Sequence, residues 1–441
     1  MKSILHANAN VRFVIPVALE SMLNTAAGLI FSYLIGGISG SSLTTIAQGN
    51  QVINLICAAA TMLVTGSGIL CARLLGAGEQ REASRVVEQT VLMTAAAALA
   101  VTAVCFGCAE PLMRLLMPGA DAAVLGEGVA FFRVLILSLP FALMNNALTS
   151  ALRASGDGRS PLVISLTLCL MQLAFAWLFL RAIPLDVVGA GLSYLISRAL
   201  GTAIAFFTLM RSHRYIVTLR GMLRAHMPTF HRILSVGVPT SIESIFVQTG
   251  YLIAGSMVIG LGTFEAASYN VANTLYSFAS LPQTICATVA PPIIGQLIGA
   301  GKLGRARSTG WRIWAIGMSI SLVLSLALWA FGGRLTPIYS SDPAVQAHAA
   351  DALFAVFVMC IPAISLNTLD PQLRVGGDVR YVMYSTIFAV WAIRLPLTYL
   401  LCYVWSMGAG GVFWANTISL CFRMVMNMRR FIQGKYLHMK V

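Results

Sequence analysis

Long apolar segments alternate with short polar segments along the whole chain. Each long apolar segment has at least about 18 residues, which is enough for an α-helix to cross the hydrocarbon core of a bilayer. The apolar runs are continuous, whereas a transmembrane β-strand would alternate apolar and polar side chains. The pattern predicts twelve transmembrane helices, at residues 12–36, 46–74, 86–108, 123–152, 161–183, 187–210, 234–261, 267–298, 311–332, 346–373, 381–404 and 408–429.

Composition leads to the same conclusion. Hydrophobic residues make up 58% of the chain and charged residues only 10%, whereas soluble domains carry about 25% charged residues. We therefore expect an all-α polytopic membrane protein. Nine cysteines are scattered, mostly within apolar segments, where cysteine acts as a small hydrophobic side chain. Cys105 and Cys108 have the spacing of a redox or metal motif, but no second pair or histidine accompanies them.

Three short motifs occur twice, and the displacement between the two copies is nearly the same each time. Residues 16–21 match 239–244, residues 75–78 match 298–301, and residues 152–159 match 373–380. The chain therefore consists of two homologous halves with six predicted helices each. We expect lobes at residues 1–210 and 234–441, joined by a basic cytoplasmic linker at 211–233. In membrane transporters the substrate path lies where such halves meet.

The distribution of basic residues predicts the orientation in the membrane. The net charge is +14, and of the 29 Lys and Arg residues only Arg114, Arg181 and Arg334 fall in the loops on the second side. Because Lys and Arg collect in cytoplasmic loops, we expect both termini in the cytoplasm and a multi-pass protein of the plasma (inner) membrane. The arginines sit in short loops, with no soluble domain to hold them, so nucleic acid is not an expected partner.

Several of these motifs resemble one family. The segment 152–161 reads Leu-Arg-Ala-Ser-Gly-Asp-Gly-Arg-Ser-Pro, and a degenerate copy follows the tenth predicted helix. Together with Pro16, Pro239, Leu-Gly-Ala-Gly at 75–78 and Arg394-Leu-Pro-Leu, it resembles the multidrug and toxic compound extrusion (MATE) transporters. The resemblance implies two six-helix lobes around a central cleft. It also implies cation-coupled export of organic, often cationic and amphipathic compounds.

The chain departs from that family at two acidic positions. Many bacterial members carry an acid in the first helix about four turns after the proline, and Phe31 stands near that position here. The acid that some members carry in the seventh helix is matched by Val247 or Gln248. The resemblance therefore leaves the ion-coupling residue of this chain open.

Glu20 and Glu243 are the candidate ion-coupling residues within the apolar segments. Each lies four residues after a proline near the start of its lobe. An ionised carboxylate is costly in the apolar layer, and desolvation favours its neutral form. We expect the two carboxylates to face each other near the lobe interface and to handle protons, in preference to sodium, or cationic substrate. The alternative is that each caps or pairs locally and holds the start of its helix.

Asp370 and Arg394 complete the charged candidates. Asp370 lies four residues before Arg374, which places both on one helix face and favours a structural ion pair. A deep arginine usually finds a partner within the protein, and for Arg394 the candidates are Glu243 and Asp370. Because that charge would tune only the second lobe, we expect replacement of Glu20 to be less damaging than replacement of Glu243.

Uncharged polar and aromatic residues of the apolar segments are candidates for the cleft wall. Amides within apolar helices can join helices together, and aromatic rings can hold cationic substrates by cation–π contact. The candidate polar residues are Asn24, Asn50, Asn146, Gln248, Asn273, Gln283 and Asn367, and the candidate aromatic residues are Phe31, Tyr33, Phe246 and Tyr276.

Nothing in the sequence indicates an enzyme, a cofactor or a metal site. The chain has no Gly-rich phosphate loop and no His-Glu-x-x-His motif. Without a nucleotide site, transport must use an ion gradient. We therefore expect a monomeric secondary active exporter of small organic compounds, working in the lipid bilayer by alternating access between its lobes. A flippase for lipid-linked saccharides is one alternative, although its cleft would need more basic residues. A non-transporting scaffold or receptor is the other.

Overall fold

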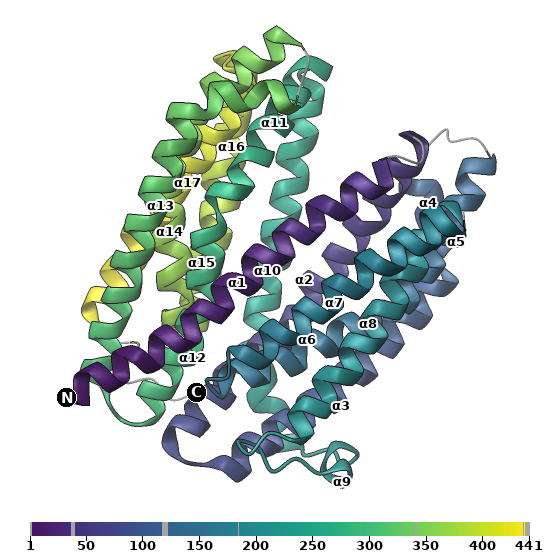
Figure 1. Ribbon diagram of the computed structural model, residues 1–441. Helices are drawn as coiled ribbons and strands as arrows, with labels where there is room; N and C mark the ends of the chain where they lie inside the picture. The colour runs from purple at the N-terminus through teal and green to yellow at the C-terminus, as the bar shows by residue number, and fades with distance from the viewer. Residues whose placement is uncertain are drawn as a thin grey trace. The chain divides into compact units, whose positions relative to one another are not determined.

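The computed structural model describes residues 2–36, 40–116, 122–183, 185–339, 342–434 and 436, and it leaves the side chains at several helix positions outside the description. The described ranges are almost entirely helical and contain no strand (Figure 1). The chain divides into two compact units, Met1–Gly237 and Val238–Val441. The expected linker at 211–233 is therefore part of the first unit.

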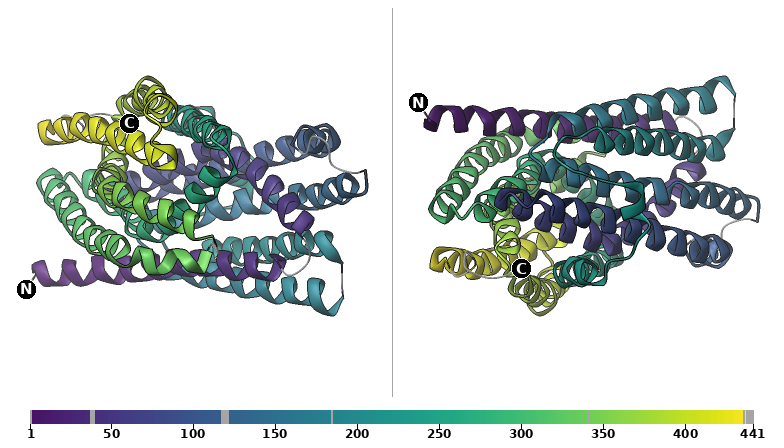
Figure 2. Two further views of the ribbon diagram at one scale, coloured as in Figure 1. Left: turned by 90° about the horizontal axis from the view of Figure 1, so that it is seen from above. Right: turned by 90° about the horizontal axis from the view of Figure 1, so that it is seen from below.

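The first unit is a bundle of long helices (Figure 2). Helix α1 packs on α7, α7 packs on α8, and α2 packs on both α3 and α6. The helices are α1 (Lys2–Gly36), α2 (Gly40–Ala77), α3 (Gln80–Gly107), α4 (Ala109–Leu116), α5 (Ala122–Leu137), α6 (Leu139–Ala154), α7 (Arg159–Trp177) with the π-helical turn η1 (Leu178–Ala182), α8 (Asp186–Met210) and α9 (Leu219–Met222).

The second unit is built around α14, which packs against α11, α12, α13 and α17. Helix α10 (Met227–Gly260) begins in the first unit and provides the first helix of the second. The remaining helices are α11 (Thr263–Ala279), α12 (Leu281–Gly299), α13 (Leu303–Tyr339), α14 (Pro343–Val375), α15 (Val379–Phe388), η2 (Ala389–Arg394), α16 (Leu395–Tyr399), η3 (Leu400–Val404) and α17 (Gly408–Gln433).

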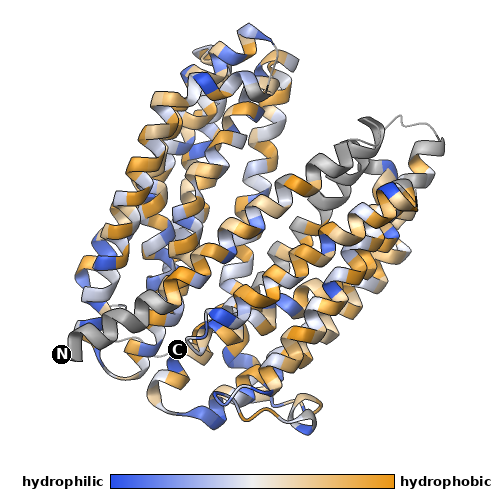
Figure 3. Cartoon of the chain, viewed as in Figure 1, coloured by the Kyte–Doolittle hydropathy of each residue, from blue (hydrophilic) through white to orange (hydrophobic). Residues whose placement is uncertain are grey.

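Helices long and apolar enough to cross a membrane dominate both units. Among the described residues nine helical segments meet this criterion, and two shorter apolar segments lie at Phe13–Gly28 and Met62–Ala77. Figure 3 shows the long helices coloured mainly as hydrophobic, with hydrophilic residues frequent near their ends. These observations confirm the predicted all-α polytopic membrane fold.

Two of the predicted helices are broken where continuous helices were expected. The segment 123–152 divides into α5 and α6 at Ser138, and 267–298 divides into α11 and α12 at Ser280. Pro140 and Pro282 follow these breaks at the first turn of the next helix. Proline has no N–H to donate to the preceding turn. Each serine hydroxyl donates instead to a carbonyl three residues earlier, at 2.6 Å for Ser138 and 2.8 Å for Ser280.

Candidate functional site

Glu20 of the first unit is buried and bound to two other helices. Its side chain projects from α1 and the residue is only 3% exposed. Nη2 of Arg153, at the end of α6, lies 2.5 Å from its Oε1 atom. The hydroxyl group of Ser165, on α7, donates to the same oxygen at 2.8 Å. One carboxylate oxygen thus joins α1, α6 and α7.

The second oxygen of Glu20 is in a different situation. Among the described residues, Oε2 is buried and accepts no hydrogen bond. A buried carboxylate oxygen without a donor is costly when the group is ionised.

Glu243 of the second unit is bound by an equivalent set of residues. Nη2 of Arg374, at the end of α14, lies 2.8 Å and 2.9 Å from its two carboxylate oxygens. The hydroxyl group of Thr386, on α15, donates to Oε1 at 2.7 Å. Glu243 projects from α10 and is buried like Glu20. Its carboxylate joins α10, α14 and α15.

These two arrangements are copies of one site. Glu243 takes the place of Glu20 in the second copy of the motif at 16–21, and Arg374 takes the place of Arg153 in the second copy of the motif at 152–159. Continued along the chain, the register of the latter motif pairs Thr386 with Ser165. Each copy consists of a carboxylate, a guanidinium group and a hydroxyl group, supplied by equivalent helices. We call them the first-unit and second-unit carboxylate sites. Each glutamate is thus bound by groups of two other helices of its own unit.

The sequence prediction missed the partners of the two glutamates. Arg374 was expected to pair with Asp370, and Arg153, Ser165 and Thr386 were not among the candidate partners. The repeat itself carried a usable signal, because both pairs follow the register that aligns residues 152–159 with 373–380. A polar residue repeated in that register within apolar helices was a candidate partner for the repeated glutamate.

A tight turn at the end of α6 places Arg153. Gly156 has a positive φ of 84°, a conformation that glycine adopts without strain. Asp157 then accepts hydrogen bonds from the backbone N–H groups of Arg159 and Ser160, at 3.0 and 3.1 Å. Its carboxylate therefore holds the first turn of α7.

The corresponding turn after α14 follows the same backbone path. Gly377 has a φ of 103°. Asp378, however, accepts a hydrogen bond from Nε of Arg430 on α17. The second-unit turn is thereby tied to α17, and among the described residues Asp157 of the first unit forms no such ion pair.

The second-unit carboxylate site extends into a larger charged network. Arg423 of α17 donates to Oε1 of Glu243 at 3.3 Å and also binds Oδ2 of Asp370. Asn427 donates to Oδ1 of Asp370 at 2.6 Å. The network therefore pairs two carboxylates with two guanidinium groups. In the first unit, Thr149 and Thr202 occupy the positions that match Asp370 and Arg423, so its site carries no equivalent charges.

The structure corrects the predicted partner of Arg394. Its guanidinium group is buried and lies over the ring of Tyr251, 4.1 Å from the ring centre. Glu243 and Asp370, the predicted partners, bind Arg374 and Arg423. Burial favours the cation–π contact, because the aromatic face offers an attraction without a second buried charge. The expectation that replacing Glu20 is less damaging than replacing Glu243 rested on an ion pair of Arg394 with an acid. Because Arg394 forms no such pair among the described residues, this expectation loses its basis. Asp370 does form an ion pair, but with Arg423 of another helix.

Three of the predicted cleft residues lie together in the second unit. Gln283 is buried, and its Oε1 atom accepts hydrogen bonds from the Tyr276 hydroxyl at 3.2 Å and from Nδ2 of Asn367 at 3.5 Å. These contacts join α11, α12 and α14. They match the role of polar residues that hold apolar helices together.

The other predicted cleft residues are distributed over both units. Phe31 is buried and packs edge-on against Tyr194, with ring centres 4.7 Å apart. Phe246 packs edge-on against Trp391 at 5.6 Å. Asn24, Asn146 and Asn273 are exposed and Gln248 is half-buried, while the side chains of Tyr33 and Asn50 lie outside the described residues.

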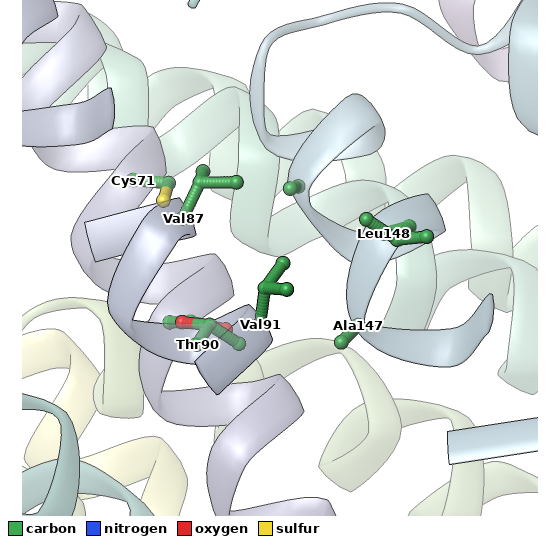
Figure 4. Close-up of a pocket in the computed structure, with 8 residues that line it drawn as sticks. Cys71, Val87, Thr90, Val91, Ala147 and Leu148 are labelled. Carbon is green, nitrogen blue, oxygen red and sulfur yellow. The ribbon is translucent and has the colours of Figure 1, made fainter. Parts of the chain in front are cut away.

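A narrow pocket lies between α2, α3 and α6 (Figure 4). Its walls include Cys71, Val87 and Thr90 on one side and Ala147 and Leu148 on the other. It leaves no space for even a water-sized molecule. It is a packing gap between helices and not a substrate site.

Comparison with known proteins identifies the relatives of this chain. The sequence profile of the family described as MatE matches residues 16–178 and 239–400, once in each half. YisQ of Bacillus subtilis, described as an uncharacterized transporter, is 23% identical over 92% of this chain and 89% of its own length. NorM of Thermotoga maritima, a probable multidrug resistance protein, is 21% identical over 97% of this chain and 92% of its own length.

Solved structures show the same fold. An outward-facing MATE family transporter of the MOP superfamily matches 98% of this chain and 96% of its own with a TM-score of 0.89, at 19% identity. A mutant of the Vibrio cholerae MATE transporter VcmN matches 98% of both chains with a TM-score of 0.88, at 16% identity. These matches confirm the family resemblance seen in the sequence motifs.

Proposed function

The chain belongs to the MatE family of multidrug and toxic compound extrusion transporters, and from this premise we propose that it exports organic cationic, amphipathic compounds in exchange for protons. Membership in a transporter family confirms the expectation that the chain is not an enzyme. It also argues against a non-transporting scaffold or receptor. We place the protein in the inner membrane with both termini in the cytoplasm, on the distribution of its basic residues.

The observation that carries the proposal is the difference between the two carboxylate sites. Four donor contacts occupy both oxygens of Glu243, from Arg374, Arg423 and Thr386. Glu20 binds donors through Oε1 alone, and its buried Oε2 is free of hydrogen bonds within the described structure. We therefore assign proton binding to Oε2 of Glu20 and a structural role to Glu243.

Proton binding at Glu20 would change how α1 is held. The ionised carboxylate accepts a charge-assisted hydrogen bond from Arg153, and such bonds are about twice as strong as neutral ones. A proton on Oε2 neutralises the carboxylate, so the attraction of Arg153 weakens while Ser165 can still donate. Helix α1 then becomes easier to move relative to α6. This change links the proton to the alternation between outward-open and inward-open states.

The atoms around Glu20 favour a proton over sodium. A hard cation such as sodium requires several oxygen acceptors around it, as the oxygen-ligand shell of calcium illustrates. The groups bound to Glu20 are a guanidinium group and a hydroxyl group that donates. Phe31, near the position where many family members carry an acid, offers no oxygen ligand.

The substrate class rests on the relatives and on the aromatic residues. Several relatives are named multidrug resistance proteins. Phe246 is partly exposed beside Trp391, and such rings can hold flat cationic compounds. A flippase for lipid-linked saccharides has less support. Its pyrophosphate would need free basic groups, and Arg394 and Arg198 are already engaged, by Tyr251 and by Ser138 with Tyr194.

Dye transport in proteoliposomes tests the proposal. Purified protein is reconstituted in vesicles loaded with a fluorescent cationic dye, and a pH gradient at constant sodium is compared with a sodium gradient at clamped pH. We expect efflux to follow the pH gradient. Glu110→Gln, which removes an exposed carboxylate paired with Arg114 on α4, serves as a matched control and should transport like the parent. Efflux that follows only the sodium gradient would refute proton coupling.

A further inference from the structure

The basic segment between α8 and α10 combines two features that lie outside the transport sites. We define this segment as residues 211–227. It connects Val188–Met210 and Met227–Gly260, two helices long and apolar enough to cross a membrane, and we therefore place it beside the membrane surface. Residues 211–226 contain four arginines and two histidines and no Asp or Glu. Figure 3 shows hydrophilic and hydrophobic residues side by side around α9.

The segment is held firmly on α3 by its backbone. Glu88 accepts hydrogen bonds from the N–H and hydroxyl groups of Thr218, at 2.7 and 3.0 Å. Gln89 donates to the carbonyl of Arg224 at 2.7 Å and accepts from the N–H of His226 at 2.8 Å. The four arginines of the segment, Arg211, Arg214, Arg220 and Arg224, are all exposed.

Tyr215 adds a second anchor on α6. Its hydroxyl group is buried and donates to the carbonyl of Ala151 at 2.7 Å. Burial raises the pKa of the Tyr215 phenol well above its usual value, so the hydroxyl keeps its proton and remains a donor. The segment is therefore a fixed surface and not a loose tether between the two halves.

This fixed surface exposes apolar and cationic side chains together. Leu223 is 80% exposed, although leucine is usually buried in an ordered segment. Ile216 and Met227 are more than half exposed. Arg220 and Arg224 flank Leu223 and are exposed as well. The acid that faces the segment from α3, Glu88, already binds Thr218, and Glu82 on the same helix pairs with Arg85.

We propose that residues 211–227 bind the anionic lipid headgroups of the bilayer that holds the protein, with Leu223, Ile216 and Met227 inserted among the lipids. The charge is complementary, because basic segments beside a transmembrane helix are attracted to anionic lipids by about 1 kcal/mol for each Lys or Arg. The exposed apolar side chains account for the insertion into the bilayer. Amphipathic interfacial segments bury such residues at the boundary between headgroups and acyl chains. This role is independent of the transport reaction.

Oxidative footprinting of the intact protein in nanodiscs tests the proposal. Nanodiscs are made from phosphatidylcholine alone or with increasing fractions of phosphatidylglycerol, and hydroxyl-radical oxidation of Met227 and Leu223 is followed by mass spectrometry. We expect phosphatidylglycerol to protect both residues. Soluble glycerol phosphate should not protect them, because it provides no acyl chains around the apolar residues.

Two variants and a control separate charge from insertion. Arg220→Gln with Arg224→Gln should lower the local attraction for anionic lipid roughly 30-fold, from the contribution of two charges, and so remove the protection. Arg181→Gln with Arg334→Gln removes two exposed arginines elsewhere and should keep it. Leu223→Ser should reduce protection of Met227 with all charges in place.

Equal protection in phosphatidylcholine alone, or full protection in the Arg220/Arg224 double variant, would overturn the proposal. Neither readout depends on transport, so failure of the transport proposal leaves this test unchanged.

Discussion

Arg374 binds Glu243 through a single nitrogen atom, which lies 2.8 Å and 2.9 Å from the two carboxylate oxygens. Its counterpart in the first unit, Arg153, reaches only one oxygen of Glu20. The two copies of the site therefore have the same kinds of residues but different occupancy of the carboxylate. Donors occupy both carboxylate oxygens in the second-unit site, whereas one oxygen of the first-unit site has no donor among the described residues.

Glu243→Gln should lower the stability of the protein. The change leaves Arg374 and Arg423 with one carboxylate, that of Asp370, in a buried network. Breaking a buried ion pair by removing one partner costs about 3–5 kcal/mol. We expect a clear fall in the midpoint of thermal unfolding in detergent. Glu110→Gln, at an exposed ion pair, is the control and should melt with the parent. An unchanged midpoint for Glu243→Gln would show that the charged network does not stabilise the fold.

Thr386 is expected to tolerate serine but not valine. Serine keeps the hydroxyl that donates to Glu243 and is the residue found at the matching position in the first unit, Ser165. Valine keeps the shape but removes the donor, which costs about 1–3 kcal/mol when the acceptor stays buried. Thermal unfolding of the two variants compares these effects directly. If serine and valine lower the midpoint equally, packing of the threonine methyl group matters more than the hydrogen bond.

The sequence was sufficient for the fold because its signals are local and repeated. Continuous apolar runs define the helices, and the duplicated motifs define the two halves. Pro140 and Pro282 gave a signal for the helix breaks at Ser138 and Ser280. The prediction missed these breaks because it used the apolar pattern alone. The predicted helix boundaries differ from the observed ones by several residues, because apolar character alone does not show where a helix begins or ends.

The contacts of the charged residues were much harder to predict. Arg423 lies far from both Glu243 and Asp370 in the sequence, so its role depends on how α17 packs. Arg394 had two acids as candidate partners, and sequence alone gave no reason to prefer the ring of Tyr251. Ser165 and Thr386 carry no charge and look like ordinary residues of apolar helices. Only their place in the repeat distinguished them.

Tyr251→Leu should destabilise the second unit, whereas Tyr251→Phe should not. The ring face of Tyr251 holds the buried guanidinium group of Arg394, and phenylalanine keeps that face. Desolvated cation–π contacts contribute about 2 kcal/mol, so the leucine variant should unfold at a lower temperature. Measurement of both midpoints checks the prediction. A phenylalanine variant as unstable as the leucine variant would assign the effect to the tyrosine hydroxyl.

Glu20→Gln should separate substrate exchange from proton coupling. Glutamine is close in size to glutamate and can still accept a hydrogen bond from Ser165, but it cannot take up a proton in the working pH range. Glu20→Gln deprives one arginine of its carboxylate, whereas Glu243→Gln affects two, Arg374 and Arg423, so the fold should tolerate the change at Glu20 better. We therefore expect a well-folded protein without a proton-responsive carboxylate on α1.

Two assays on the same proteoliposomes decide this prediction. Exchange of labelled for unlabelled substrate needs binding and alternation but no ion gradient, and it should persist in Glu20→Gln. Efflux driven by an imposed pH gradient should be lost, and the rate of exchange should no longer depend on pH. Glu110→Gln should match the parent in both assays. Parental pH-driven efflux in a folded Glu20→Gln protein would exclude Oε2 of Glu20 as the proton site and turn attention to Asp370 and Glu243.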